Sequence, residues 1–331
     1  SHEEIINKFK NTYDLIDDTA DPAELRFARV EITPPNGDVF QPVEKWDFEI
    51  DQSITPTWWN DFYKKTAIDC LSSFLQSAIL VGKDLQELSS GRYWVKDCKI
   101  AALKGDALIV QLWGNSQVGV LRENSQVGEL RENSKVGVLW GNSKVGELRE
   151  NSEVGVLREN SQVGVLRENS QVGELMENSQ VGVLWENSQV GELWGNSKVG
   201  ELRENSKVGV LWGNSKVGEL RENSEVGVLR ENSQVGVLRE NSQVGELMEN
   251  SQVGVLWENS QVGELWGNSK VRVLWENSQV GELRENSQVN VFSSKAKYLL
   301  KEDAIAIIRI GDTPKIVVAN SGITIEVQNI Q

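Results

Sequence analysis

The chain of 331 residues is poor in the residues from which metal sites, disulfide frameworks and catalytic centres are built. It contains one histidine, His2, and two cysteines, Cys70 and Cys98, without a CxxC pair. We therefore expect no disulfide framework, no bound metal and no cofactor. Two free thiols and the absence of a recognisable secretion signal favour a reducing compartment, so we expect a cytoplasmic protein.

The sequence also lacks long apolar runs and clustered positive charge. No stretch approaches the roughly 20 apolar residues that a membrane span needs, so no membrane partner is expected. The formal net charge is -15. Direct binding of nucleic acid is not expected either, because it requires clustered Lys and Arg side chains.

What the sequence has in abundance is a repeat of nine residues. From Trp113 to Phe292 the chain reads as twenty consecutive units, such as WGNSQVGVL and RENSQVGEL, with no insertion. Two degenerate units, 95–103 and 104–112, precede them. The array of residues 95–292 therefore holds about 22 units.

We number the positions of a unit as slots one to nine. Slots three, four, six and nine hold Asn, Ser, Val and Leu in nearly every unit, whereas slots one, two, five and eight vary. In the degenerate units, slot four holds the small residues Cys98 and Ala107. We therefore expect Ser, Val and Leu to point inward and Asn to form a ladder of stacked amides at a corner, with the variable slots facing solvent or a partner. Glycine in slot seven gives way to other residues, for example Val110, Arg272 and Asn290, so it does not need a positive φ, and we expect it to thin the bend.

The pattern predicts a mostly β fold, a parallel β-solenoid. A helix is the competing interpretation, but Gly and Asn-Ser in every unit disfavour it. Nine residues at about 3.3 Å each give a perimeter near 30 Å, too small to enclose Val and Leu side chains. We therefore expect two units, about 18 residues, per turn, and about eleven turns spanning roughly 50 Å.

The non-repetitive residues 1–94 are expected to form a small α+β capping domain at the amino-terminal end of the solenoid. Glu3–Asp17 has the pattern of an amphipathic helix, and Arg26–Thr33 and Val39–Ile50 have that of a strand hairpin. A second, long helix is predicted over Thr55–Ile79, with Thr55 as the N-cap residue and proline in the first helical position.

Residues 293–331 are expected to form a β cap at the other end. Their strand candidates are Ala304–Ile310, Lys315–Ala319 and Ile323–Val327. An open solenoid end is an edge that invites further pairing, so these strands are expected to close it, and pairing with another chain is an alternative way of doing so.

The array contains a direct duplication. Residues 131–199 and 203–271 are identical, so a block of eight whole units has been copied. A catalytic domain would not tolerate such copying, whereas a molecular ruler or a multivalent surface would. The duplication therefore indicates an array whose length is free to vary.

Slot one is the most informative variable position, because eight units carry tryptophan there. One interpretation is structural, with each indole lying flat across the neighbouring coil. The other is a contact strip, since Trp and Arg dominate binding hot spots. Two groups are densest in sequence and are the candidate interaction residues, Trp185 with Trp194, and Trp257 with Trp266 and Trp275.

The Asn-Ser-x-Val core of residues 95–292 resembles the N-[AS]-x-V nonapeptide arrays of variable copy number that follow a non-repetitive head in proteins of gut bacteria and their phages. The resemblance implies a solenoid of variable length and no particular activity. The period is also similar to the calcium-binding β-roll repeat, but Asn-Ser replaces its second glycine and its ligand Asp, so calcium is not expected. Pentapeptide-repeat proteins, acidic solenoids that imitate duplex DNA, are a looser analogy, and this chain lacks their period.

We therefore expect a non-enzymatic β-solenoid scaffold whose Arg/Trp/Glu surface binds an unidentified protein or a second copy of the chain, as a homodimer. The Glu side chains in slots two and eight recur in many units, so no pair stands out as an acid and base. The alternative is an acidic DNA mimic that inhibits a nucleic-acid-binding enzyme. Against it, the twenty units sum to a charge of only about -9, whereas duplex DNA carries one charge per about 1.7 Å.

Overall fold

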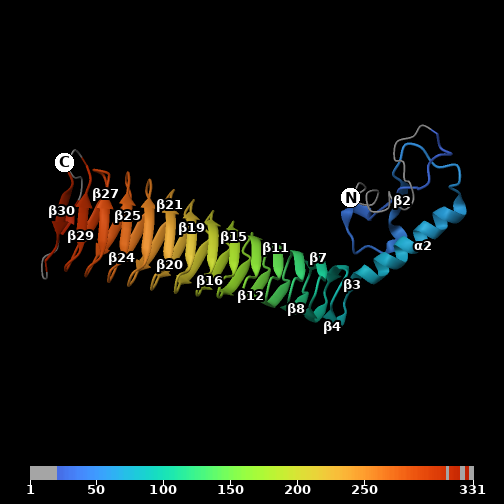
Figure 1. The fold of residues 1–331 in the computed structure, drawn as a ribbon, viewed down its shortest axis with the longest axis horizontal. Helices are drawn as coiled ribbons and strands as arrows, with labels where there is room; N and C mark the ends of the chain where they lie inside the picture. Colours follow the sequence, from blue (N-terminus) through green and yellow to red (C-terminus); the bar gives the residue numbers. More distant parts are fainter. Residues whose placement is uncertain (1–20, 311–312, 321–324, 328–331) are drawn as a thin grey trace. The chain divides into compact units, whose positions relative to one another are not determined.

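The computed structural model describes residues 21–310, 313–320 and 325–327 of the chain. It divides into two compact units, Ser1–Val81 and Gly82–Gln331. The larger unit is a parallel β-solenoid of about 13 turns with a period of 18 residues (Figure 1). The predicted fold class and the predicted two units per turn are both confirmed.

Successive repeat units lie alternately in two sheets that form the two flat faces of the solenoid. The first, which we call the even sheet, has 14 strands: β4 (Asp84–Leu88), β6 (Lys99–Leu103), β8 (Gln117–Leu121), β10 (Lys135–Leu139), β12 (Glu153–Leu157), β14 (Gln171–Leu175), β16 (Gln189–Leu193), β18 (Lys207–Leu211), β20 (Glu225–Leu229), β22 (Gln243–Leu247), β24 (Gln261–Leu265), β26 (Gln279–Leu283), β28 (Lys297–Leu300) and β31 (Ile325–Val327).

The opposite face is the odd sheet. In this unit it contains β5 (Arg92–Lys96), β7 (Leu108–Trp113), β9 (Gln126–Leu130), β11 (Lys144–Leu148), β13 (Gln162–Leu166), β15 (Gln180–Leu184), β17 (Lys198–Leu202), β19 (Lys216–Leu220), β21 (Gln234–Leu238), β23 (Gln252–Leu256), β25 (Lys270–Leu274), β27 (Gln288–Val291), β29 (Ile305–Ile308) and β30 (Lys315–Val318). Through the array each strand pairs in parallel with the equivalent strand of the next turn, for example Val136 with Val154.

The core is built from slots four, six and nine, as the sequence predicted. Every Ser of slot four and every Leu of slot nine in the array is fully buried, and the Val of slot six is at most 2% exposed. Because one turn contains two whole units, each of these side chains lies above an identical one in the next turn. The core is therefore a stack of the same few contacts, which explains why these slots accept so little variation.

Slots one to four form a tight turn, in which the Ser N–H of slot four donates to the carbonyl of slot one, for example Ser134 to Arg131 at 3.2 Å. Slot two lies in the left-handed region in every one of the twenty units: φ is 49° to 63° where it is Glu and 69° to 72° where it is Gly. Glycine adopts this conformation without strain, whereas the slot-two glutamates adopt it at a cost in backbone energy. The predicted Asn ladder is present at some turns, for example Asn196 Nδ2 to Asn178 Oδ1 at 3.4 Å.

The sequence predicted that slot-seven glycine need not have a positive φ at every turn, and none of these glycines has one. The predicted reason for glycine was wrong. The glycine lies in the middle of a strand and not at a bend. A Cβ atom at Gly182 would lie 2.4 Å from the carbonyl oxygen of Gly164 in the preceding turn. Glycine here permits the close stacking of turns.

The solenoid is longer than the repeat alone indicated, with about 13 turns in place of the expected eleven. It begins before residue 95, because Leu85 and Leu88 of β4 pair with Ile100 and Leu103 of β6. It continues past residue 292 through β28 and β29. A turn of the solenoid needs a strand with apolar side chains, and β4, β28 and β29 provide such strands although their sequences lack the Asn-Ser-x-Val motif.

At the carboxyl-terminal end, the predicted strands are present. β30 pairs antiparallel with β29, and β31 pairs antiparallel with β28. Each sheet therefore ends on an antiparallel strand, and the parallel stacking of turns stops there.

The smaller unit contains β1 (Val30–Thr33), two short 3-10 helices, η1 (Pro35–Gly37) and η2 (Val43–Lys45), β2 (Asp47–Ile50), α2 (Asp61–Ala78) and β3 (Ile79–Val81). β1 and β2 form the predicted antiparallel pair, although η2 occupies part of the predicted second strand. The helix Glu3–Asp17 falls outside the described residues.

The predicted start of the long helix was wrong. Asn60, not Thr55, is the N-cap residue, and its Oδ1 accepts hydrogen bonds from the backbone N–H groups of Phe62 and Tyr63. The stretch after Pro56 makes a turn instead, in which the Trp59 N–H donates to the Pro56 carbonyl at 3.0 Å. An asparagine whose side chain satisfies two free N–H groups is a strong helix start.

Candidate binding surfaces of the solenoid

The slot-one side chains form two ladders, one along each edge of the solenoid. We call the ladder that follows the odd-sheet strands the first edge, and the ladder that follows the even-sheet strands the second edge. Because neighbouring units are half a turn apart, consecutive slot-one residues fall on opposite edges, and residues one full turn apart are neighbours. Each edge is therefore a separate surface with its own sequence of side chains.

The first edge is an alternation of tryptophan with runs of arginine. In order it presents Trp113, Arg131, Arg149, Arg167, Trp185, Arg203, Arg221, Arg239, Trp257 and Trp275. Phe292, a slot-nine residue, follows Trp275 because the register shifts by one residue at β27. The guanidinium groups of Arg167 and Arg203 lie 5.5 and 4.4 Å from the ring centre of Trp185, one on each side. Such cation–π contacts contribute about 0.5–1 kcal/mol each at exposed sites.

Glutamates of slot eight connect the arginines of the first edge into a zipper. Arg221 contacts Glu201 at 3.1 Å and Glu219 at 2.9 Å, and Arg239 contacts Glu219 at 2.8 Å. The same arrangement occurs one copied block earlier, at Arg149 and Arg167 with Glu129 and Glu147.

The zipper shifts the pKa of Arg221 and of Glu219. The hydrogen bond from Arg221 to Glu219 raises the pKa of Arg221 above its ordinary value, against the opposing effect of burial. Burial acts to raise the pKa of Glu219, but the hydrogen bond and charge of Arg221, together with Arg239, outweigh it, so the pKa is lowered. Glu219 is therefore held in its charged form, paired with Arg221 and Arg239.

The second edge is more apolar and more exposed. In order it presents Arg122, Trp140, Arg158, Met176, Trp194, Trp212, Arg230, Met248, Trp266 and Arg284. The indole rings of Trp194 and Trp212 stack with centroids 4.9 Å apart and planes 4° from parallel. Trp140 and Trp194 are each 37% exposed, more than the other slot-one tryptophans.

The structure divides the predicted tryptophan clusters between the two edges. Trp185 lies on the first edge and Trp194 on the second, so they do not form a cluster. Trp257 and Trp275 do meet on the first edge, with ring centroids 5.6 Å apart, while Trp266 lies on the second edge. Proximity in sequence was the wrong signal, because a step of one unit crosses the solenoid.

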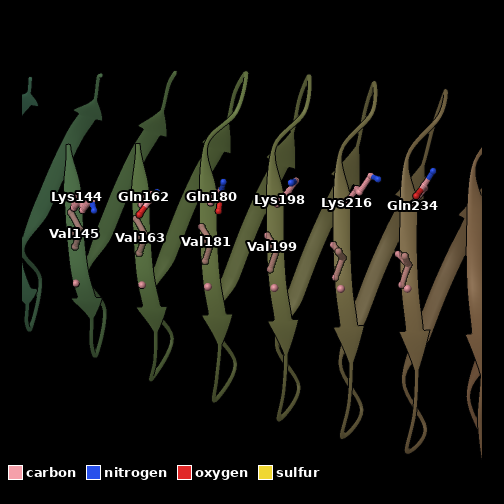
Figure 2. Close-up of a pocket in the computed structure, with 18 of the residues that line it drawn as sticks. Lys144, Val145, Gln162, Val163, Gln180, Val181, Lys198, Val199, Lys216 and Gln234 are labelled. Carbon is pink, nitrogen blue, oxygen red and sulfur yellow. The ribbon is translucent and has the colours of Figure 1, made fainter. Parts of the chain in front are cut away.

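A long shallow trough runs along the outer face of the odd sheet (Figure 2). It extends from Gln126 in β9 to Arg272 in β25 and has a volume of about 950 Å³. Its lining comes from slots five, six and seven of each strand, with Gln or Lys side chains beside a row of glycines. At one end Arg272 replaces the slot-seven glycine, and its guanidinium donates to Gln252 Oε1 at 2.7 and 3.2 Å.

The trough is cationic although the chain is acidic. Its charged lining residues are Lys144, Lys198, Lys216 and Arg272, and no carboxylate lines it. Within the described residues none of the three lysines makes an ion pair.

The even sheet differs in both respects. It has two shorter hollows of about 590 and 370 Å³, with Glu153 lining both of them. Lys135 and Lys207 are paired there, with Glu153 at 2.5 Å and with Glu225 at 2.7 Å. The two faces are built from the same repeat but differ in the charge of their slot-five side chains. The difference becomes visible in the sequence only when the slot-five residues of every second unit are compared.

Among the described residues, no group of three or more His, Cys, Asp or Glu side chains is placed so that it could hold a metal ion. In the same part of the chain, no helix combines the length and apolar character of a membrane crossing. Comparison of the chain with protein-family models, with curated proteins and with solved structures finds no match.

Proposed function

We propose that this chain is a non-enzymatic scaffold, a rigid solenoid that presents repeated slot-one surfaces to a protein partner or to a second copy of itself. The observation that carries the proposal is the size of the copied block. Eight units are four whole turns, so each copied side chain returns to the same edge. A block of any odd number of units would have moved the copied side chains to the opposite edge.

The duplication places equivalent tryptophans in line. Trp185 and its copy Trp257 both lie on the first edge, and Trp194 and its copy Trp266 both lie on the second. Four turns at about 4.8 Å separate the members of each pair by about 19 Å. A partner with two binding modules, or a second solenoid, can engage both copies at once, and such double engagement raises affinity without new kinds of contact.

The second edge is the better candidate for the contact. Trp194 is exposed and already stacked on Trp212, so its order is set before any partner arrives. Pre-ordered aromatic side chains lose little entropy on binding. On the first edge Trp185 lies between two arginines, which favours a structural role. Trp266 of the second edge has an arginine, Arg284, against its ring as well.

The test compares two matched double variants. Trp194→Ser with Trp266→Ser alters the second edge, and Trp185→Ser with Trp257→Ser alters the first. Sedimentation measures self-association, and capture from a native lysate followed by a quantified affinity measures partner binding. We expect binding by the intact chain, a loss of at least tenfold for the second-edge variant, and a smaller loss for the first-edge control. An intact chain that stays monomeric and captures nothing would remove the proposal.

The first edge gives the DNA-mimic alternative no support. A mimic needs free carboxylates in phosphate-like rows, but on the first edge Glu201 and Glu219 are bound by arginines. Neutralised carboxylates present little of the negative field that a nucleic-acid-binding enzyme recognises. The scaffold proposal is therefore preferred.

A further inference from the structure

The floor of the trough on the odd sheet is a row of slot-seven glycines. At each strand from β9 to β23 the slot-seven residue is glycine, and a Cβ there would lie 2.3 to 2.5 Å from a carbonyl oxygen of the preceding turn. Glycine therefore keeps side chains out of this row from β9 to β23. The result is a continuous open channel over nine strands, about 38 Å long at about 4.8 Å per step.

The charge of the trough requires a separate explanation. Its lining contains three lysines and one arginine without a carboxylate, on a chain whose net charge is -15. The equivalent hollows on the even sheet contain Lys99, Lys135 and Lys207 together with Asp84, Glu153 and Glu225, so their charges balance. Lysines that lack a carboxylate partner in a groove are complementary to an anionic ligand.

We propose that the trough binds a linear anionic polysaccharide, such as a polyuronate, lying along the solenoid axis. The uniform course of the groove fits an unbranched polymer, and the lysines fit its acidic groups. Gln162, Gln180 and Gln234 supply amide donors and acceptors between the lysines, which suits the hydroxyl groups of sugars. The glycine row lets the face of a sugar ring approach the backbone closely.

The repeat distance favours a sugar polymer over a peptide. Turns are spaced by about 4.8 Å, a length comparable to one pyranose ring, so one sugar unit can lie over each turn of the glycine floor, with lysines at three of the turns. An extended peptide advances about 3.3 Å per residue and falls out of step. Single-stranded nucleic acid binds through stacking on aromatic side chains, and no aromatic residue lines the trough.

The experiment measures binding of fluorescent polygalacturonate oligomers to the full chain by anisotropy at low and moderate salt. The trough variant replaces Lys144, Lys198 and Lys216 with Gln. The control replaces Lys99, Lys135 and Lys207 with Gln, three lysines in the hollows of the opposite face, so both variants change the net charge equally. Gln is already the commonest slot-five residue, so both variants are expected to fold, which circular dichroism checks.

We expect the intact chain to bind, the trough variant to lose about tenfold or more in affinity, and the control to stay within about twofold. Equal losses in both variants would indicate non-specific charge attraction and would overturn the proposal, as would the absence of binding by the intact chain. Equal or tighter binding of poly-glutamate or of an oligo-thymidylate would overturn the assignment to polysaccharide.

A second variant tests the geometry without removing a lysine. Arg272→Gly removes the side chain that occupies the end of the trough and contacts Gln252. If the ligand lies along the trough, this variant should accept longer oligomers, with the affinity still rising at lengths where the intact chain has reached its plateau. An unchanged length dependence would contradict an axial ligand.

Discussion

Deleting one repeat unit should have a different effect from deleting two, because a turn contains two units. Gln126 and Gln234 both begin strands of the odd sheet and are connected by six pairing steps along it. Spin labels at these positions should lie about 29 Å apart along the axis, at about 4.8 Å per step. Deleting residues 149–166, two units, should keep both labels on the same face and shorten this separation to about 24 Å.

Deleting residues 203–211, one unit, should move every later unit to the opposite sheet. The second spin label then lies on the opposite face from the first. The distance between the two labels should therefore exceed that in the intact protein, because the sheets are about 10 Å apart and the label side chains point outward from both. The core should be kept, since Ser, Val and Leu occupy the same slots in both sheets. The same deletion transfers Lys216 to the even sheet and should therefore also weaken polygalacturonate binding.

The assay is double electron–electron resonance, after Cys70 and Cys98 have been replaced by Ser. Cys98 occupies slot four, where Ser is the usual residue, and Cys70 is exposed. Thermal unfolding of both deletions provides the control for folding. A one-unit deletion whose labels remain on one face at a shortened distance would refute the two-unit turn.

Three further predictions concern stability. Glu222→Gly should stabilise the solenoid by about 1 kcal/mol in urea unfolding, because Glu222 has a φ of 53°; no gain would contradict left-handed strain. Ser206→Ala should lose about 1 kcal/mol because the hydroxyl donates to the Arg203 carbonyl at 2.6 Å, whereas Ser197→Ala should be nearly neutral, since the Ser197 hydroxyl has no hydrogen-bond partner among the described residues. Arg221→Gln should cost up to about 1 kcal/mol at pH 7. Because the pKa of Glu219 is lowered, its pairing stabilises above the ordinary Glu pKa and is lost as pH falls through the lowered value, so the Arg221→Gln difference should shrink in acid.

Much of the fold could be predicted because each position of the repeat occurs many times in one chain, so the residues found at that position can be compared. Slots that are nearly constant identified the buried Ser, Val and Leu, and the volume of Val and Leu excluded a turn made of a single unit. The ends could not be predicted as well. Leu85 and Leu88 belong to the first turns of the solenoid, but their strand lacks the repeat letters, and the start of α2 depended on which of several polar residues capped it.

The candidate surfaces were predictable by residue type but not by grouping. The sequence singled out Trp185, Trp194, Trp257, Trp266 and Trp275 as slot-one residues, and all are placed in the two ladders. Which of them meet depends on the half-turn between neighbouring units, and the stacking of Trp194 on Trp212 is visible only when alternate units are compared.

By itself the sequence determined a β-solenoid with a Ser/Val/Leu core and an array that grows by copying, because burial limits the residues that identical turns can accept. Only the tertiary structure decided that slot-two Glu lies at positive φ, that slot-seven glycine admits the next turn, and that Lys144, Lys198 and Lys216 line one trough without a carboxylate. These properties arise between turns, where residues two units apart meet, and no local pattern within one unit specifies what the neighbouring turn presents.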